Sequence, residues 1–325
     1  GAKGDLFVNM GTSTNACQAK DRTAAVPGQD PCVELETRGG TWRYDANRLG
    51  QVFSPAERYA TGIRNGEGYA FDTAGRLYVT QHGRDQLPEL WPKLYPDLKA
   101  ATELPSEEVV RVVKDGDYGW PFCYYDGAQK KLVLAPEYGG DGGKSVGACA
   151  RKLPPVAAFP AHWAPNDLAI YKAKAFPTAY QGGMFIAFHG SWNRAPEPQA
   201  GFNVTFQPFR NGKVAGPYVV FADGFAGPGK AAGKADYRPT GLAVGSDGAL
   251  FIVDDVKGRI WRVTYHGPAT AQVVGTSAPK AAKTERPPMT GANLPTPLGA
   301  TAEQVAAGAR LFGAASCAGC HGADA

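Results

Sequence analysis

The sequence has no long apolar run and no block of charge of one sign. No apolar stretch in its 325 residues approaches the length of a membrane span, so no transmembrane segment is predicted. Its lysines and arginines are spread out, and the formal net charge is only +4. This distribution argues against a nucleic-acid surface and against a polybasic membrane patch. No signal peptide is visible.

Glycine and proline are abundant instead, with 42 and 26 residues respectively, beside frequent valine and aromatic residues. Such a composition favours short strands joined by turns over a helical protein. A glycine-containing turn followed by alternating apolar residues occurs at residues 2–9, 73–80 and 246–253. This is the pattern of hairpin strands.

Longer segments repeat this unit. Residues 63–81 align with residues 237–255, because each segment has an arginine, a short apolar strand, a turn and a second strand. A partial third copy covers residues 164–190. Repeats of a few strands, separated by long polar loops of unequal length, predict an all-β fold of the β-propeller type. A β-sandwich is the alternative.

The six cysteines form three local pairs. Two pairs, Cys17 with Cys32 and Cys123 with Cys149, lie in polar, glycine-rich segments where a disulfide would close a short loop. Folding outside the cytoplasm would permit these disulfides. Four unrelated buried thiols are the alternative, because spacing alone does not fix connectivity.

The third pair belongs to the pentapeptide CAGCH, which has the C-x-x-C-H pattern of a c-type haem attachment site. Cys317 and Cys320 would bind the haem vinyl groups, and His321 would ligate the iron. Residues 302–312 are rich in helix formers, as at the start of a small cytochrome c domain. A zinc half-site is the alternative, but no second Cys or His pair follows.

These patterns divide the chain into three parts. Residues 1–266 are the predicted propeller, residues 267–300 are a Pro/Ala-rich linker, and residues 301–325 begin an α-helical cytochrome c domain. The first residues correspond to a turn between two strands, and a cytochrome needs more residues than follow CAGCH. We therefore expect the sequence to be a fragment cut at both ends.

Unusual polar clusters lie at the predicted strand ends, where propeller loops face a central channel. Arginine forks bind carboxylates and stack on flat rings, and tryptophans can add a stacking face. The clusters therefore predict a pocket for a planar, anionic group. They are Arg64–Asn65, Gln81–Arg84, His162–Trp163, Phe188–Arg194 and Asp236–Arg238.

The order of these motifs resembles that of the soluble sugar dehydrogenases that depend on pyrroloquinoline quinone (PQQ), with the sorbosone and pyranose dehydrogenases as the nearest branch. The similar elements are RNGEGYAFDTAGRLYVTQHGRDQL, an acidic cluster, YGWP, PAHWAP and FHGSWNR, and they cover most of residues 1–265. The resemblance implies a six-bladed propeller, of which this chain would hold roughly the last four blades. It also implies PQQ and Ca²⁺ as cofactors.

By this resemblance, Arg64 and Asn65 contact the quinone, and Arg64 stabilises negative charge on its reduced oxygens. Gly83 and Arg84 bind the calcium ion through their backbone carbonyls, as suits an ion with oxygen ligands. His82 lies just before that turn and should face the pocket. Arg64 and His82 are thus the predicted catalytic residues.

The same resemblance assigns the remaining cofactor contacts. Arg238 pairs with a PQQ carboxylate, and Asp236 stands where the family often has a second arginine. Arg194 takes the place of a lysine on the facing strand. His162 and Trp192 complete the predicted PQQ pocket.

The implied function is oxidation of an aldose or a sugar aldehyde such as sorbosone, with PQQ as the hydride acceptor. Haem c would then pass electrons to a respiratory acceptor in the bacterial periplasm. One alternative is a propeller that only binds a ligand. Another is a lactonase-type hydrolase, with metal ligands among Asp72, Asp247, Asp254 and Asp255, although Asp72 and Asp247 fit hairpin turns better.

The general-base histidine of the resembling family lies in the strand before the segment at residues 2–9, so it would precede Gly1. None of the five histidines here matches it. We therefore expect this chain on its own not to turn over. The check is an assay of the purified chain with PQQ, calcium and an artificial acceptor. Measurable sugar oxidation would refute the expectation.

Overall fold

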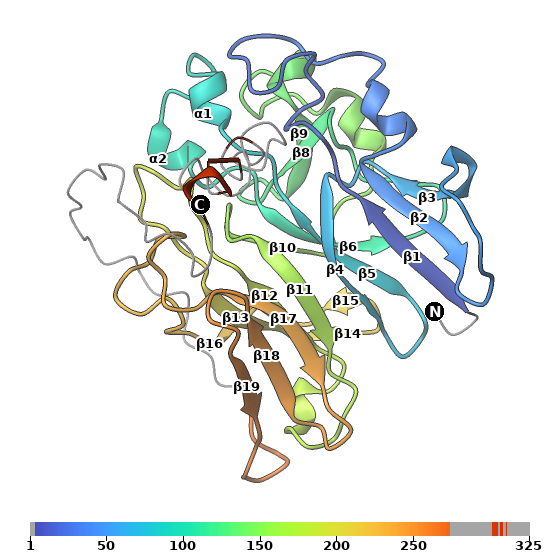
Figure 1. The fold of residues 1–325 in the computed structure, drawn as a ribbon, viewed down its shortest axis with the longest axis vertical. Coiled ribbons are helices and arrows are strands. Elements are labelled where there is room, and N and C mark those ends of the chain that lie inside the picture. Colours follow the sequence, from blue (N-terminus) through green and yellow to red (C-terminus); the bar gives the residue numbers. More distant parts are fainter. Residues whose placement is uncertain (1–3, 274–300, 305, 308–309, 311–325) are drawn as a thin grey trace.

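The computed structural model describes residues 4–273, 301–304, 306–307 and 310. Within them the chain forms mainly antiparallel sheets that follow one another around the molecule (Figure 1). The predicted all-β architecture is therefore confirmed. Among the described residues, no helix is long and apolar enough to cross a membrane.

Two sheets come from the first half of the chain. The first sheet contains β1 (Asp5–Met10), β2 (Gly40–Asp45), β3 (Arg58–Thr61) and β7 (Gly116–Asp117). The second contains β4 (Asn65–Phe71), β5 (Leu77–His82), β6 (Glu107–Val112) and β10 (Ala157–Phe159). Only β7 joins its neighbour in the parallel direction in these two sheets.

Two further sheets follow. The third contains β11 (Pro165–Ile170), β12 (Met184–Phe188), β13 (Asn203–Gln207) and β16 (Val219–Ala222). The fourth contains β17 (Pro239–Val244), β18 (Leu250–Asp254) and β19 (Ile260–Val263). The hairpins β4–β5, β11–β12 and β17–β18 confirm the three predicted copies of the repeat.

The remaining elements are short and lie in the loops. Two ribbons are β8 (Cys123–Asp126) with β9 (Lys131–Leu134), and β14 (Phe209–Arg210) with β15 (Lys213–Val214). The short α-helices are α1 (Leu87–Leu90) and α2 (Leu98–Ala101). Short 3-10 turns cover Val33–Glu36, Pro55–Glu57, Pro136–Tyr138, Gly147–Arg151 and Thr178–Tyr180.

The inner strands β4, β11 and β17 lie side by side and fix the sheets relative to one another. Gly68 of β4 permits the first contact, because a Cβ there would lie 2.5 Å from the Cα of Asp167. Asp167 makes the second contact by accepting a 2.7 Å hydrogen bond from the backbone N–H of Leu242 in β17. This arrangement brings the same end of all three hairpins together.

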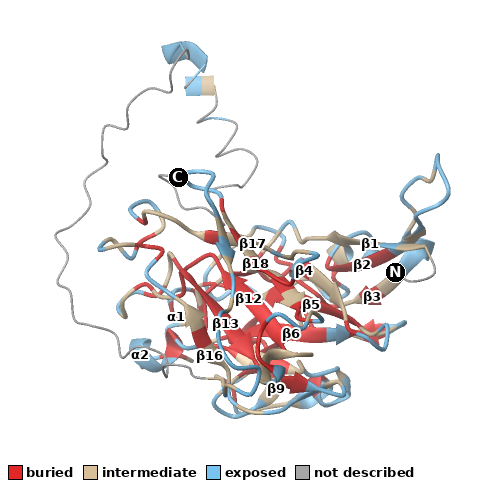
Figure 2. Cartoon of the chain, turned by 90° about the horizontal axis from the view of Figure 1, so that it is seen from below, coloured by how far each residue is buried: buried red, intermediate tan, exposed pale blue. Residues whose placement is uncertain are grey.

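The apolar cores lie between neighbouring sheets, where Figure 2 shows the buried residues. Every side chain of β12 is buried, and alternate side chains point to opposite faces of its sheet. Ile186 and Phe188 pack with Tyr78 toward the second sheet. Phe185 packs with Leu250 toward the fourth sheet. The continuous apolar run at residues 184–188 thus follows from burial on both faces.

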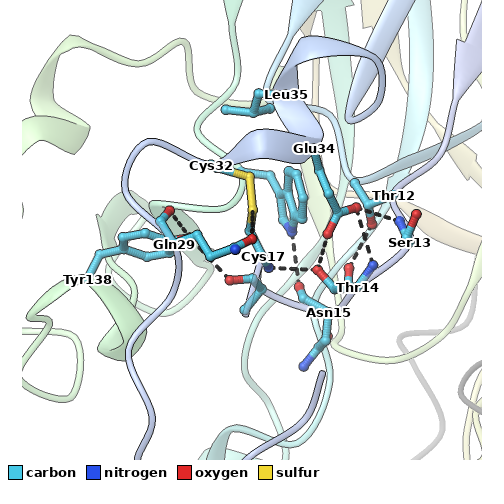
Figure 3. The surroundings of a disulfide bond; sticks show 12 residues. Thr12, Ser13, Thr14, Asn15, Cys17, Gln29, Cys32, Glu34, Leu35 and Tyr138 are labelled. Atoms are coloured by element: carbon cyan, nitrogen blue, oxygen red, sulfur yellow. Dashed lines mark hydrogen bonds between the residues drawn. A yellow bond between two sulfur atoms is a disulfide. The ribbon is translucent and has the colours of Figure 1, made fainter. Parts of the chain in front are cut away.

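Both predicted disulfides are present. Cys17 bonds to Cys32 across 15 residues, and Cys123 bonds to Cys149 across 26 residues. The Cys17–Cys32 bridge packs against the ring of Trp120, and its surroundings are drawn in Figure 3. Four unrelated thiols, the alternative interpretation, are thereby excluded.

The helix predicted before CAGCH is described only at its start. Residues 302–304 are helical, the Thr301 hydroxyl accepts a bond from the Gln304 N–H, and the Gln304 side chain accepts one from the Thr301 N–H. This reciprocal pair is a capping box, which marks a helix N-terminus. The predicted haem residues Cys317, Cys320 and His321 lie outside the described residues.

The substitution Phe185→Ala tests the core between the third and fourth sheets. The ring is fully buried among aromatic neighbours, so its loss should lower the free energy of unfolding by about 3–5 kcal/mol. Urea unfolding measures the change. Leu49→Ala is the control, because Leu49 is 96% exposed and should cost less than about 0.5 kcal/mol. Equal effects at the two positions would contradict this packing.

Candidate cofactor site

The predicted polar clusters gather at one end of the hairpins. In each antiparallel hairpin the start of the first strand pairs with the end of the second, as Asn65 pairs with His82 and Pro239 with Asp254. The same relation holds for Pro165 and Phe188 in β11–β12. Segments near residues 64, 83, 162, 189 and 238 therefore adjoin one end of the inner strands, as a pocket requires.

Arg64 is buried at this end, immediately before β4. Its guanidinium donates a 2.7 Å hydrogen bond to the carbonyl of Gly83 and a 3.2 Å bond to the carboxylate of Asp85. Its backbone N–H is held by Gln81 at 3.0 Å. The neighbouring Asn65 accepts a bond from the N–H of Thr12. Arg64 is thus fixed against the turn predicted to bind calcium.

The turn at Gly83 and Arg84 is held from a second side by Glu107. One Glu107 oxygen accepts the N–H of Gly83 at 2.9 Å, and the other accepts the N–H of Ala164 at 3.1 Å. The Arg84 side chain forms a buried ion pair with Glu137. The side chain of Arg84 is therefore structural, and only its backbone is left for the predicted calcium role.

Asp85 is the charged centre of the site. Its carboxylate accepts hydrogen bonds from Arg22 at 2.9 Å, Arg64 at 3.2 Å and Asn193 at 2.7 Å, and His162 lies 3.8 Å away. Burial alone would raise the Asp85 pKa, but the charges of Arg64 and Arg22 outweigh it and lower the pKa to about 2. Asp85 is therefore ionised at neutral pH.

Burial favours the neutral form of both predicted site histidines, His82 and His162. Burial is the main cause that lowers the pKa of His82, and the charge of Arg64 lowers it further. The Nε2 atom of His82 is buried and has no hydrogen-bond partner among the described residues. The pKa of His162 is also lowered by burial, and its ring contacts the carbonyl of Leu104 at 3.1 Å. His82 thus keeps one ring nitrogen for a ligand.

The general-base histidine expected before Gly1 stays a prediction. Gly1 itself lies outside the described residues, which begin at Gly4, immediately before β1. Within the described part of the chain, the site end of the hairpins holds His82, His162 and His189, none of which matches that base. No general-base role is therefore assigned to any histidine of this site.

Arg238 occupies the start of β17. Its guanidinium donates to the carbonyls of His189 at 2.9 Å and Gly190 at 3.0 Å. No carboxylate lies within ion-pair distance of it in the described part of the chain. Desolvation lowers the pKa of Arg238, and the charge of Asp255, beyond ion-pair distance, opposes this only in part. His189 itself contacts the carboxylate of Asp255 at 2.9 Å. Arg238 is therefore a half-buried cation that can receive an anionic group.

Two predicted residues need correction. Trp163 is 5% exposed and packs edge-on against Phe188, so the prediction that it offers a stacking face is wrong. Arg194 uses its donors on Glu103 and on the carbonyls of Ala161 and Pro198. It braces two loops instead of presenting a free cation.

Trp192, in contrast, is only partly buried in the loop after β12. It stays a predicted stacking residue. Asp236, the position where the family often has a second arginine, pairs with Lys257 at 3.0 Å on the surface.

The residues present fit a planar anion. Arg64 and Arg238 supply positive charge, and the orphaned Nε2 of His82 supplies a polar atom. For calcium, no group of three or more His, Cys, Asp or Glu side chains is poised to hold a metal within the described ranges. The protein would therefore contribute backbone oxygens, and Gly83 retains a second lone pair beside its bond to Arg64.

Three of the four aspartates that the lactonase alternative would use make structural hydrogen bonds to backbone N–H groups. Asp72 and Asp247 cap the far turns of their hairpins, since they accept the N–H groups of Ala74 and Ala249. Asp254 lies at the site end but binds the N–H of Arg238. A cavity of about 430 Å³ also lies at the far end and is lined by none of the predicted cofactor residues.

The fold is similar to that of solved PQQ-dependent sugar dehydrogenases. The PQQ domain of pyranose dehydrogenase from Coprinopsis cinerea superimposes with a TM-score of 0.57 and 19% identity, over 81% of this chain and 67% of that one. A Trichoderma reesei enzyme of Carbohydrate-Active Enzymes family AA12 gives 0.58 and 20%, over 79% and 64%. These likenesses show the β-propeller fold of the PQQ-dependent sugar dehydrogenases.

The family model described as TrAA12-like matches residues 3–266, so the chain belongs to the TrAA12-like family. A Borreliella burgdorferi protein is 27% identical over 64% of this chain and 49% of its own length. The PQQ-dependent pyranose dehydrogenase of Coprinopsis cinerea is 25% identical over 62% of this chain and 30% of its own. The chain thus spans half or less of these curated relatives.

Sequence reasoning missed several residues that the structure places in the site. Asp85 directly follows the predicted turn, but its role depends on Arg22, 63 residues earlier in the chain. Glu107 and Glu108 were visible only as an acidic cluster. Glu108 is buried, Gln81 hydrogen-bonds to it, and its Oε2 has no partner among the described residues. It lines a cavity of about 20 Å³, which has room for one water.

Glu108→Gln tests this burial through the pH dependence of stability. Burial raises the Glu108 pKa from 4.5 to about 8. The wild-type protein should therefore lose free energy of unfolding as pH rises between these values. The variant should lose less, because only the loss from neighbouring Glu107, whose pKa burial raises to about 7, remains. The variant should gain roughly 2–5 kcal/mol relative to wild type across this range. Urea unfolding at several pH values checks it, with exposed Glu57→Gln as control. Parallel wild-type and Glu108→Gln curves would contradict the burial.

Proposed function

We propose that this protein is a PQQ-dependent dehydrogenase that oxidises an aldose or a sugar aldehyde such as sorbosone. In this proposal the cofactor lies at the site end of β4, β11 and β17. The electrons then pass to a c-type haem at residues 317–321 and on to a respiratory acceptor. Membership of the TrAA12-like family and the similarity to a PQQ-dependent pyranose dehydrogenase support the proposal.

The observation that carries the proposal is the state of Arg238. A half-buried guanidinium normally has an anionic partner, because an unpaired charge is costly to desolvate. Arg238 has carbonyl partners but no carboxylate within ion-pair distance among the described residues. A carboxylate of PQQ would supply that partner, with the planar fork of arginine favouring bidentate contact.

The other residues divide the remaining work. Arg64 lies against the Gly83 turn and would stabilise negative charge that develops on the ligand. His82, kept neutral by burial, can donate or accept a hydrogen bond through its free Nε2. The backbone carbonyls of Gly83 and Arg84 would hold Ca²⁺. The bound quinone itself would accept the hydride, which no side chain here can do.

The compartment and the electron path belong to the same proposal. CAGCH supports covalent haem attachment. The two disulfides support folding in an oxidising compartment, for which we propose the bacterial periplasm. A fused haem would accept, one at a time, the two electrons released by the sugar oxidation. This would account for a cytochrome c segment that follows the propeller.

Titration calorimetry with PQQ, with and without calcium, tests the cofactor assignment. Binding should depend on calcium, and Arg64→Ala or Arg238→Ala should weaken it by about tenfold to a hundredfold, because each removes charge-assisted hydrogen bonds. Arg43→Ala is the matched control, since Arg43 is half exposed and pairs with Asp5 on the surface. Absence of binding in the folded protein would leave a propeller that binds some other ligand.

A further inference from the structure

A loop closed by the first disulfide reaches across to the candidate site. We call residues 11–32 the clamp loop; they have no helix or strand, and Cys17–Cys32 closes most of them. The bridge is anchored by Trp120, whose indole N–H donates a 3.0 Å bond to the Asn15 carbonyl. The Tyr138 hydroxyl adds a 3.2 Å bond to the Ala16 carbonyl. The clamp loop is therefore fixed to the body of the protein at its disulfide.

Asn15 holds the backbone of Asp85 at two points. Its amide nitrogen donates to the Asp85 carbonyl at 2.9 Å, and its amide oxygen accepts the Asp85 N–H at 2.8 Å. Both residues are buried, with Asn15 only 1% exposed. An asparagine that satisfies both backbone groups of a buried residue replaces a strand partner. It therefore determines where the segment after Gly83 and Arg84 lies.

Arg22 holds the same segment through side chains. Its guanidinium donates to Asp85 at 2.9 Å and to the side chain of Gln86 at 2.6 Å. The oxygen of Asp85 that Arg22 contacts is also the one that Arg64 contacts, at 3.2 Å. One carboxylate thus lies between two guanidinium groups. Arg22 balances the charge of Asp85, which leaves the charge of Arg64 available for an anionic ligand.

We propose that the clamp loop positions the cofactor site. Asn15 fixes the backbone of the Gly83–Asp85 turn. Arg22 balances the charge of Asp85, so that the charge of Arg64 remains available to the anionic cofactor. The Cys17–Cys32 bridge keeps both residues within reach, since Asn15 and Arg22 lie two and five residues from Cys17. The part that concerns Arg22 rests on the proposed function. The part that concerns Asn15 does not.

Hydrogen exchange tests the hold on the turn without any cofactor. Asn15→Ala and the pair Cys17→Ser/Cys32→Ser should each speed exchange of the Asp85 amide by about tenfold or more, because its hydrogen-bond acceptor is removed or released. The control is Cys123→Ser/Cys149→Ser, which opens the longer loop and, among the described residues, removes no hydrogen bond to Asp85. Exchange of β13 amides reports general loosening.

Two hydrogen-exchange results would contradict the proposal that the clamp loop positions the turn. The first is an Asp85 amide that stays as protected in both variants as in wild type. The second is equal acceleration in the Cys123/Cys149 control, since the effect would then follow from lost stability in general. Acceleration confined to the Asn15 and Cys17/Cys32 variants, with β13 unchanged, supports it.

PQQ titration tests whether Arg22 leaves the charge of Arg64 available to bind the cofactor. Arg22→Ala should weaken PQQ binding by about tenfold, because Asp85 then neutralises Arg64 alone. Arg22→Lys keeps the charge and should restore most of the affinity, which loss of shape alone would not explain. Wild-type affinity in Arg22→Ala would overturn this role, as would a lysine variant as weak as the alanine one.

The two arms separate the possible failures. A wild-type protein that binds no PQQ would overturn the proposed function, and the Arg22 role with it. The exchange arm would still decide whether the clamp loop positions the turn. Melting curves show whether Arg22→Ala is folded. If it is not, the affinity test uses Arg22→Lys and Cys17→Ser/Cys32→Ser.

Discussion

The candidate site depends on one buried carboxylate, that of Asp85, placed between the buried guanidinium group of Arg64 and the partly buried one of Arg22. Asp85 would be costly to bury alone, and so would Arg22 or Arg64, but together they leave a single net positive charge. The position of Asp85 between these groups is fixed, because the Asn15 side chain hydrogen-bonds to both the carbonyl and the N–H of Asp85. In the proposed function, the charge of Arg64 that Asp85 does not balance would face the anionic cofactor.

The sheets supply the geometry in which this charge is useful. Hairpin pairing places the starts and ends of successive strands at one end, so residues far apart in sequence meet without needing long connections. The apolar faces of β12 pack toward both neighbouring sheets and hold the sheets at fixed angles. Binding groups on the loops thus rest on a rigid scaffold, as a preorganised site requires.

Much of this could be predicted from the sequence, and the reasons for the rest are physical. The strand pattern of the repeats predicted the hairpins, and the motifs at strand ends predicted Arg64 and Arg238. The role of Asp85 could not be predicted, because its partners Asn15 and Arg22 lie in a loop whose sequence has no periodic apolar pattern. Arg194 was misassigned because only the folded loop shows that Glu103 and two carbonyls occupy its donors.

Gly68 gives the architecture a consequence of a different kind. It has no functional group, yet the absence of its Cβ lets β4 approach the Asp167 backbone of β11. Any side chain there would force the two strands apart and open the angle between their sheets. The distance between β4, which Arg64 directly precedes, and β11 therefore depends on the absence of a single methyl group.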